Sequence, residues 1–239
     1  MLEIKNLEKA YFNNQQTVRV FDNFNLSVND GEFITIFGPN GCGKTTLLNI
    51  IAGTLKLDSG EINFNDRPIN SLRIGFVFQD YRNSLFPWLK IKDNISFPLK
   101  LKNVDRKIRE KEVGEMCKRF GCNFNLESFS YELSGGQQQF ISLLRGLIIN
   151  PELYLLDEPF SSLDYQTTLL MLEKLSEIWQ KTKITTLFVS HEIDEAIFLS
   201  QRIVLLSNKP SSIVKIFDNP LPYPRKISLL GSPEFAKLK

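Results

Sequence analysis

Cysteine and histidine are scarce in this 239-residue sequence, which contains three cysteines and one histidine. Three thiols are too few for a disulfide framework. Cys117 and Cys122 have no second cysteine pair or histidines near them, so a structural metal site is not expected there. This cysteine usage is typical of a protein from a reducing compartment.

The sequence also lacks long hydrophobic runs and an excess of charge. No stretch reaches the roughly 18 apolar residues that cross a bilayer, and the N-terminus has no basic segment followed by an apolar one, as a signal peptide would. The net charge of +2 gives no basic field for nucleic acid, so we expect no nucleic-acid partner. If the protein works at a membrane, another chain must hold it there.

Short apolar segments alternate with helical stretches along the chain, a pattern that favours an α/β sheet. Several segments read as buried parallel strands or as closing strands of one sheet. They are residues 33–37, 74–78, 153–156, 186–189, 203–206 and 213–217. Residues 2–7 and 24–28 instead alternate like strands near a sheet edge.

The pattern changes between about 82 and 148, which we interpret as a helical insertion into a single domain spanning 1–239. Aromatic and proline-containing loops are expected first. Residues 105–120 then predict an amphipathic helix that packs one face into the core, formed by Val113, Met116, Cys117 and Phe120. The proline-rich tail, about 218–239, is expected to be loose and peripheral.

A glycine-rich segment after the strand at 33–37 matches G-x-x-x-x-G-K-[ST], the phosphate loop of nucleotide hydrolases. Glycines let backbone N–H groups point at phosphate oxygens, and the following helix adds a favourable dipole. Lys44 is expected to reach the β and γ phosphates, and the Thr45 hydroxyl to bind Mg²⁺. The predicted ATP-binding residues here are Gly38, Pro39, Asn40, Gly41, Cys42, Gly43, Lys44, Thr45 and Thr46.

Cys42 lies inside this loop, where a helix N-terminus can lower the pKa of a thiol. It is therefore either a redox switch or a small residue that the loop tolerates, and we favour the second interpretation.

A second acidic segment ends the predicted strand at 153–156. Asp157 and Glu158 follow it directly. In a phosphate-loop protein, Asp157 is expected near Mg²⁺ and Glu158 near the water that attacks the γ-phosphate.

The segment Leu133-Ser134-Gly135-Gly136-Gln137 resembles the LSGGQ signature of ATP-binding cassette (ABC) proteins. Its amides begin an apolar helix, an arrangement that suits a γ-phosphate. In that family the phosphate belongs to the opposite subunit, so the resemblance implies a dimer of two such chains, most simply identical, with Ser134, Gly135, Gly136 and Gln137 contacting ATP.

Further residues match family motifs in order along the chain. Gln79 resembles the Q-loop glutamine, which touches magnesium or water, and His191 the switch histidine, which contacts the γ-phosphate. Residues 162–164 resemble the D-loop. Tyr11 resembles the aromatic residue that stacks on adenine, although the adjacent Phe12 is an alternative.

The resemblance covers about residues 1–225. It implies an α/β fold with a phosphate-loop NTPase core and a mostly parallel sheet, an N-terminal antiparallel β part and an inserted helical subdomain. The family often reads LSGGQ-x-Q-R, whereas this chain has Phe140 at the arginine position. That departure affects the expected packing around the signature helix and the expected rate of hydrolysis.

Residues 79–88, 189–196 and 221–225 resemble those of ATPases from the nitrate, sulfonate, taurine and bicarbonate importer group. The resemblance implies an ATPase at the cytoplasmic face of the inner membrane, a permease that contacts 79–88, and indirectly a solute-binding protein. The aromatic stretch at 79–88 fits a partner helix or, alternatively, a small satellite core. Two other functions stay open: a non-transport ATPase of DNA repair or the ribosome, and a regulatory subunit that does not hydrolyse ATP.

Overall fold

The computed structural model describes residues 1–13, 16–80 and 84–239. Within these residues, a six-stranded sheet has the order β10-β9-β3-β8-β7-β6. Its neighbouring strands are parallel except for β10, which pairs antiparallel with β9 at one edge. The strands are β3 (Phe33–Phe37), β6 (Ile74–Val77), β7 (Leu153–Asp157), β8 (Thr185–Ser190), β9 (Arg202–Leu206) and β10 (Ile213–Asp218). The mostly parallel α/β fold is therefore confirmed, although β6 ends one residue before Phe78.

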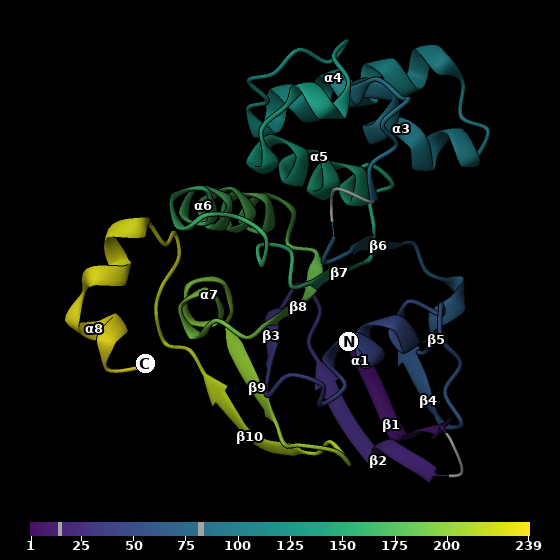
Figure 1. Ribbon diagram of the computed structural model, residues 1–239, viewed down its shortest axis with the longest axis vertical. Coiled ribbons are helices and arrows are strands. Elements are labelled where there is room, and N and C mark those ends of the chain that lie inside the picture. The colour runs from purple at the N-terminus through teal and green to yellow at the C-terminus, as the bar shows by residue number, and fades with distance from the viewer. Residues whose placement is uncertain (14–15, 81–83) are drawn as a thin grey trace.

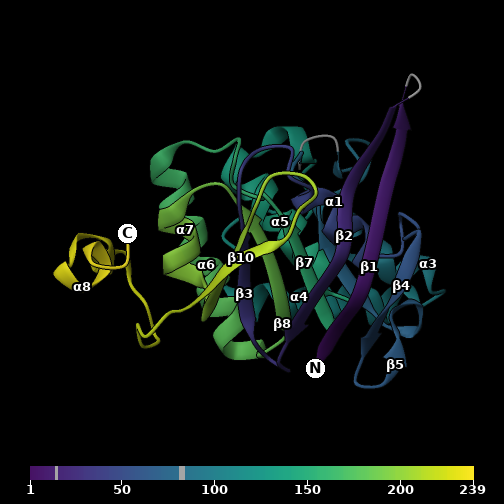
Figure 2. The ribbon, with the colours of Figure 1, turned by 90° about the horizontal axis from the view of Figure 1, so that it is seen from below.

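An antiparallel sheet of four described strands has the order β2-β1-β4-β5. It is formed by β1 (Leu2–Asn13), β2 (Gln16–Val28), β4 (Ser59–Phe64) and β5 (Arg67–Pro68). Residues 24–28 lie in β2 at one edge of this sheet, and residues 2–7 lie in β1, the next strand in, which pairs with β2 on one side and β4 on the other. Figure 2 shows β1 and β2 projecting from the domain as a long ribbon.

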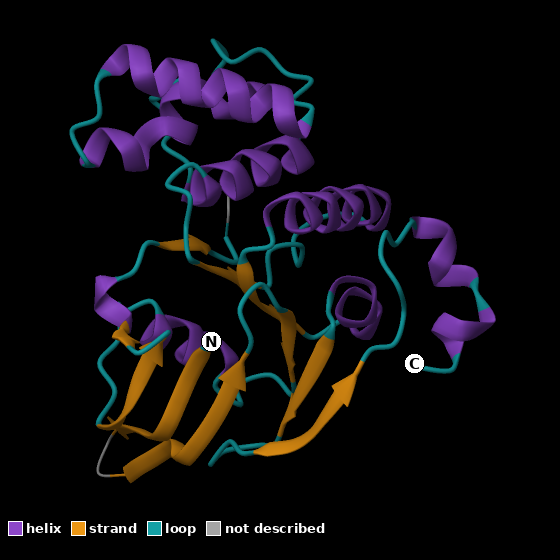
Figure 3. Ribbon diagram, turned by 180° about the vertical axis from the view of Figure 1, so that it is seen from behind, coloured by secondary structure: helices purple, strands orange, loops and turns teal. Residues whose placement is uncertain are grey.

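Helix α1 (Lys44–Ile51) packs its apolar side chains into a core that the two sheets share. Figure 3 shows this helix with strands of both sheets around it. Side chains alternate across a strand, so Leu153 and Leu155 of β7 enter this core while Tyr154 and Leu156 face the opposite side. This two-sided burial explains the continuous apolar runs in the sequence.

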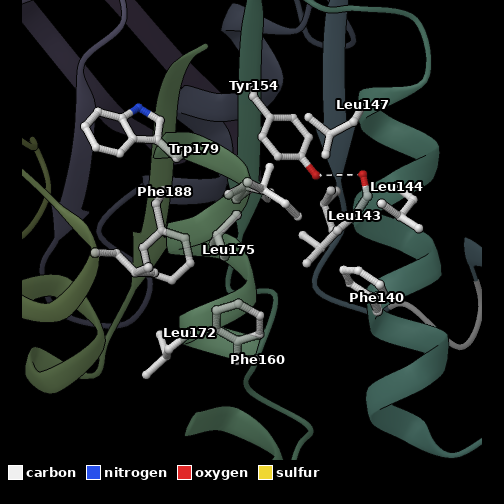
Figure 4. Close-up of a cluster of buried hydrophobic side chains, with 14 of the residues drawn as sticks. Phe140, Leu143, Leu144, Leu147, Tyr154, Phe160, Leu172, Leu175, Trp179 and Phe188 are labelled. Carbon is white, nitrogen blue, oxygen red and sulfur yellow. Dashed lines mark hydrogen bonds between the residues drawn. The ribbon is translucent and has the colours of Figure 1, made fainter. Parts of the chain in front are cut away.

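The opposite face of the parallel sheet is covered by α5 (Gly135–Leu147), α6 (Tyr165–Thr182) and α7 (Ile193–Leu199). Figure 4 shows the aromatic centre of this second core. There the Tyr154 hydroxyl donates a hydrogen bond to the Leu143 carbonyl at 2.9 Å. The core therefore joins α5, which carries the signature, to the strand that carries Asp157.

Helices α3 (Ile91–Leu101) and α4 (Arg106–Phe120) lie with α5 at the top of Figure 1. In α4, Val113, Cys117 and Phe120 are buried as the sequence predicts, and Met116 is partly buried. The expectation of loops alone before α4 is wrong, because α3 forms there despite Pro98 in its interior. The buried Asn94 helps to hold α3 in place, because its side chain forms hydrogen bonds with the backbone of Phe86 and Leu89.

The C-terminal tail is packed rather than loose. It contains a 3₁₀ turn at Ile227–Gly231 and the short helix α8 (Pro233–Ala236), and Leu221 and Phe235 are buried. Two further 3₁₀ turns occur at Ile69–Ser71 and Ser130–Glu132. None of the helices described is both long and apolar enough to cross a bilayer.

Candidate functional site

The phosphate loop connects β3 to α1 in the backbone conformation that its glycines permit. Gly41 and Gly43 have positive φ values of 77° and 119°. A Cβ on Gly43 would lie 2.6 Å from Cγ1 of Val20, so the loop also packs too closely on β2 for a side chain there. The Lys44 side chain is 4% exposed, and its ammonium donates to the carbonyls of Gly38 at 2.9 Å and Pro39 at 3.2 Å. Both ends of the loop are thus held around one buried cation.

The end of β7 brings two carboxylates to this loop. Asp157 accepts a hydrogen bond from the Thr45 hydroxyl at 3.1 Å, and Glu158 lies 3.8 Å from the Lys44 ammonium. Both can face the loop because Glu158 has φ 41°, a left-handed conformation that turns the chain directly after the strand. Such a conformation is costly for a residue other than glycine and is concentrated at functional sites.

Gln79 and His191 converge on Glu158 from two other strand ends. The Gln79 amide donates to Oε2 of Glu158 at 3.3 Å, and Nδ1 of His191 lies 3.1 Å from the same oxygen. Three segments that are far apart in sequence therefore meet at one carboxylate, whose side chain is 14% exposed. This arrangement can hold a general base in one orientation beside the phosphate loop.

A cavity of about 200 Å³ opens between the phosphate loop and Glu158. Its lining includes Asn40, Gly41, Thr46 and, from the connection between β9 and β10, Lys209. Lys209 is not marked in the sequence, because its connection matches no nucleotide-binding motif and meets the phosphate loop only in the folded chain.

The residues at the base of this site fit a magnesium ion. Thr45 and Asp157 place a hydroxyl and a carboxylate oxygen 3.1 Å apart. Burial raises the pKa of the Asp157 carboxyl to about 6, and the charge on Glu158 adds to this rise. A divalent cation would favour the ionised form. Among the described residues no three acidic, histidine or cysteine side chains form a metal cage, but Mg²⁺ is usually held by one or two carboxylates plus phosphates.

The signature residues begin α5 but do not line the cavity described above. Ser134 caps the helix: its hydroxyl accepts the Gln137 N–H at 3.4 Å, and the Gln137 side chain accepts the Ser134 N–H at 3.0 Å. A Cβ on Gly136 would lie 2.5 Å from Cγ2 of Thr167, so this helix start packs closely on α6. Gly135 is partly buried and Ser134 exposed.

Tyr11 and Phe12, the two candidates for the adenine contact, lie on β1 and also outside that cavity. Tyr11 is 41% exposed and has the Lys9 ammonium 5.6 Å from its ring centre, whereas Phe12 is 86% exposed. Both rings therefore remain accessible to a ligand.

Phe140 replaces the usual arginine without leaving a gap. Its ring is 5% exposed, meets Phe124 edge to face at 6.4 Å and lies 5.9 Å from the Lys174 ammonium. The packing around the signature helix is therefore apolar at this position.

Cys42 is 1% exposed, and burial raises the pKa of its thiol. A buried thiol with a raised pKa is a poor nucleophile. The structure therefore favours the interpretation of Cys42 as a small tolerated residue over that of a redox switch.

Glu195 is a buried carboxyl next to the site that the sequence did not single out. It is 8% exposed and accepts a hydrogen bond from the Ser190 hydroxyl at 2.6 Å. Burial raises its pKa from the ordinary 4.5 to about 7, although the Ser190 hydrogen bond opposes the rise. The folded chain thus holds this proton more tightly than the unfolded chain does, so the carboxyl lowers the free energy of unfolding as the pH rises from about 4.5 to about 7.

A Glu195→Gln substitution is therefore expected to stabilise the domain at pH 8, by about 2 kcal/mol, and to have a smaller effect at pH 5. The amide oxygen can still accept the Ser190 hydrogen bond. Urea unfolding at both pH values measures the difference, with the exposed Glu234→Gln, far along the chain in the tail, as the control. An equal gain at both pH values, or a loss at pH 8, would contradict the assignment of a protonated carboxyl.

Comparisons with known proteins agree with this geometry. The family described as ABC transporter matches residues 21–161. The aliphatic sulfonates import ATP-binding protein SsuB of Bacillus cereus is 42% identical over 226 residues, covering 94% of this chain and 88% of that protein. An uncharacterized ABC transporter ATP-binding protein of Methanocaldococcus jannaschii is 38% identical over 238 residues, 99% of this chain and 88% of its own length.

Among solved structures, the dimeric post-hydrolysis state of the ATP-binding cassette MJ0796 bound to ADP and Pi aligns with a TM-score of 0.79. It shares 30% sequence identity and covers 93% of this chain and 100% of that chain. Fold and site together define a nucleotide-hydrolysing cassette. The chain belongs to the ABC transporter family, and the resemblance seen in the sequence is confirmed. It is an ATPase of that family, and the family binds ATP.

Proposed function

We propose that this chain is the ATP-hydrolysing subunit of an importer for aliphatic sulfonates or a related small anion, within the group that also takes nitrate, taurine and bicarbonate. The solute class rests on the 42% identity with the sulfonate import protein of Bacillus cereus. The ATPase role rests on one observation above all: Gln79 and His191 hold Glu158 beside the buried Lys44.

In this mechanism the phosphate loop binds the β and γ phosphates of ATP through its backbone N–H groups and Lys44. Tyr11 stacks on adenine. Glu158 takes a proton from the attacking water, while Gln79 and His191 keep its Oε2 oxygen in place. A His191 ring protonated at Nδ1 donates to that oxygen. Catalysis then comes mainly from positioning and from charge stabilisation.

Thr45 and Asp157 are the residues that would hold Mg²⁺, with Gln79 close to the ion or to its water. When bound, the ion neutralises charge on the phosphate oxygens.

The hydrolytic site is proposed to be completed by a second copy of the chain. The signature residues Ser134 to Gln137 are absent from the cavity lined by the phosphate loop, yet they begin a helix of 13 residues with Ser134 exposed. A helix N-terminus attracts a phosphate. A head-to-tail dimer would place each signature on the ATP of the other copy, and the MJ0796 cassette is itself described as dimeric.

The permease is proposed to dock at a groove of about 540 Å³ beside the Q-loop. The groove is lined mainly by aromatic and apolar side chains of β6 and α3, together with Phe86 and the polar residues Asp80 and Arg145. Within the 79–88 segment, residues 81–83 lie outside those described. Leu85 is buried in the main core on the α5 side of the parallel sheet rather than in a separate satellite core, whereas Trp88 is 71% exposed and free to contact a partner. The chain would then lie peripherally at the cytoplasmic face of the inner membrane, with a solute-binding protein acting on the permease.

A pull-down tests the assembly. Tagged Glu158→Gln protein with MgATP is recovered from its own host in mild detergent, and partners are identified by mass spectrometry. Recovery of a permease supports the proposal. An added Trp88→Ala change should weaken that recovery, whereas Ile108→Ala, an exposed apolar residue of α4, should not. Recovery of ribosomal or DNA-associated proteins without a permease would overturn the transport role.

The solute is tested on the binding protein that accompanies the permease. We expect an aliphatic sulfonate to raise its melting temperature. Stabilisation by nitrate or bicarbonate, and not by sulfonates, would reassign the solute within the same group.

A further inference from the structure

The connection between β9 and β10, residues 207–212, is fixed against the phosphate loop. The Ser211 N–H donates to the Val20 carbonyl at 2.7 Å, and the Ser211 hydroxyl donates to the carbonyl of Cys42 inside the phosphate loop. At the start of the connection, the Leu206 carbonyl would lie 3.1 Å from a Cβ placed on Gly38. Both ends of the connection thus contact the loop or the strand that supports it.

The connection is also closed on itself. The Ser207 N–H donates to the Ser212 carbonyl at 2.9 Å, and the Ser207 hydroxyl accepts the Ser212 N–H at 3.0 Å. These two bonds define a short turn that presents Asn208, Lys209 and Pro210. The position of Lys209 is therefore set by backbone contacts on either side of it.

Lys209 lines the same cavity as Gly41, Lys44, Thr45 and Glu158. Its charge also acts on the neighbouring Cys42, where it lowers the thiol pKa slightly against the larger rise that burial causes. Lys44 is enclosed by the phosphate loop and forms an ion pair with Glu158 at 3.8 Å. Lys209, in contrast, is exposed at the rim of the cavity. The cavity thus has a second cation. Its position is set by its own connection and not by Glu158, Gln79 or His191.

We propose that Lys209 is a second phosphate-binding cation of the nucleotide site, which contacts the phosphate chain of bound ATP from the rim of the phosphate loop. The inference rests on the proposed ATPase function of this site. A triphosphate concentrates negative charge, and a hydrogen bond between an ammonium and a phosphate oxygen is among the stronger ones in proteins. The alternative is that Lys209 is a solvated surface lysine that does not change the affinity for the nucleotide.

Calorimetric titration of MgATP into Lys209→Met protein tests the contact. We expect the Kd for ATP to rise roughly tenfold, because one charge-assisted hydrogen bond is lost. Lys209→Arg should restore binding to within about threefold of wild type, since a cation remains. Lys215→Met is the matched control: it removes an exposed lysine of β10 that does not line the cavity, and its Kd should equal that of wild type.

A second measurement uses unaltered protein, so it does not depend on the folding of a variant. Lysines are acetylated briefly with an amine-reactive ester, with and without MgATP, and modification is read by mass spectrometry. MgATP should protect Lys209 several-fold and leave Lys215 unprotected. The proposal is overturned if Lys209→Met binds ATP like wild type or if MgATP does not protect Lys209. Failure of the wild-type chain to bind ATP would remove the proposed function itself.

Discussion

A Glu158→Gln substitution is expected to abolish ATP turnover while leaving ATP binding intact. The amide cannot take a proton from water, and loss of a general base typically slows a reaction by about 10² to 10⁴-fold. The amide keeps the size of the carboxyl and can still accept the bond from His191, so the phosphate loop should be undisturbed. Phosphate release and calorimetric titration of MgATP measure the two properties separately.

A closed dimer held together by unhydrolysed ATP gives a second readout for Glu158→Gln. With MgATP present the variant should elute as a dimer in size-exclusion chromatography with light scattering, because closure occurs and hydrolysis does not reopen it. Glu234→Gln, which alters an exposed carboxylate of the tail, should behave as wild type in every assay. Substantial residual hydrolysis by Glu158→Gln would remove Glu158 from the role of general base.

Among the substitutions proposed for this chain, Arg225→Met is expected to cause the largest loss of stability, about 3 kcal/mol in the free energy of unfolding. Arg225 is 4% exposed and donates to the carbonyls of Leu221, Ile197, Phe198 and Ser200. Methionine fills similar space but donates nothing, and each buried carbonyl left unpaired costs about 1–3 kcal/mol. For a domain of this size, the melting temperature should fall by roughly 6–12 °C.

Two further variants serve as comparisons for the stability of Arg225→Met. Arg225→Lys should lose part of the stability, because one ammonium reaches fewer acceptors than the guanidinium. Arg106→Met removes an arginine whose side chain is 74% exposed and should change the melting temperature little. If Arg225→Met has the same melting temperature as wild type, the prediction is wrong. Asn219, which also donates to the Ile197 and Ser200 carbonyls, would then be sufficient to hold the C-terminal end of α7.

The position of Arg225 connects the tail to the helix that follows His191. Its acceptors Ile197 and Phe198 lie in α7, which begins two residues after His191. The tail therefore holds the helix that follows the histidine proposed to orient Glu158. The prolines of this tail predict a loose segment, but an arginine whose acceptors are all backbone carbonyls leaves no pattern in the sequence.

Local motifs made parts of the fold and site predictable from the sequence. The phosphate loop can form in few ways, because Gly41 and Gly43 supply backbone angles that other residues resist. Helix α4 was predicted from its apolar period, and the structure adds an N-cap at Asp105 and a left-handed C-cap at Gly121 that agree with it. Helix α3 was missed because Pro98 signals a break, whereas tertiary bonds through Asn94 support the helix there.

The sequence by itself determined the class of chemistry in this protein, because its glycine, lysine and acidic motifs are local and each needs only a strand and a helix to present it. Tertiary structure alone decided which side chains meet: Gln79 and His191 on one oxygen of Glu158, Lys209 at the rim of the phosphate loop, and Arg225 at the C-terminal end of α7. These contacts join residues that are distant in sequence, and their geometry follows from strand order and packing, which no local pattern encodes.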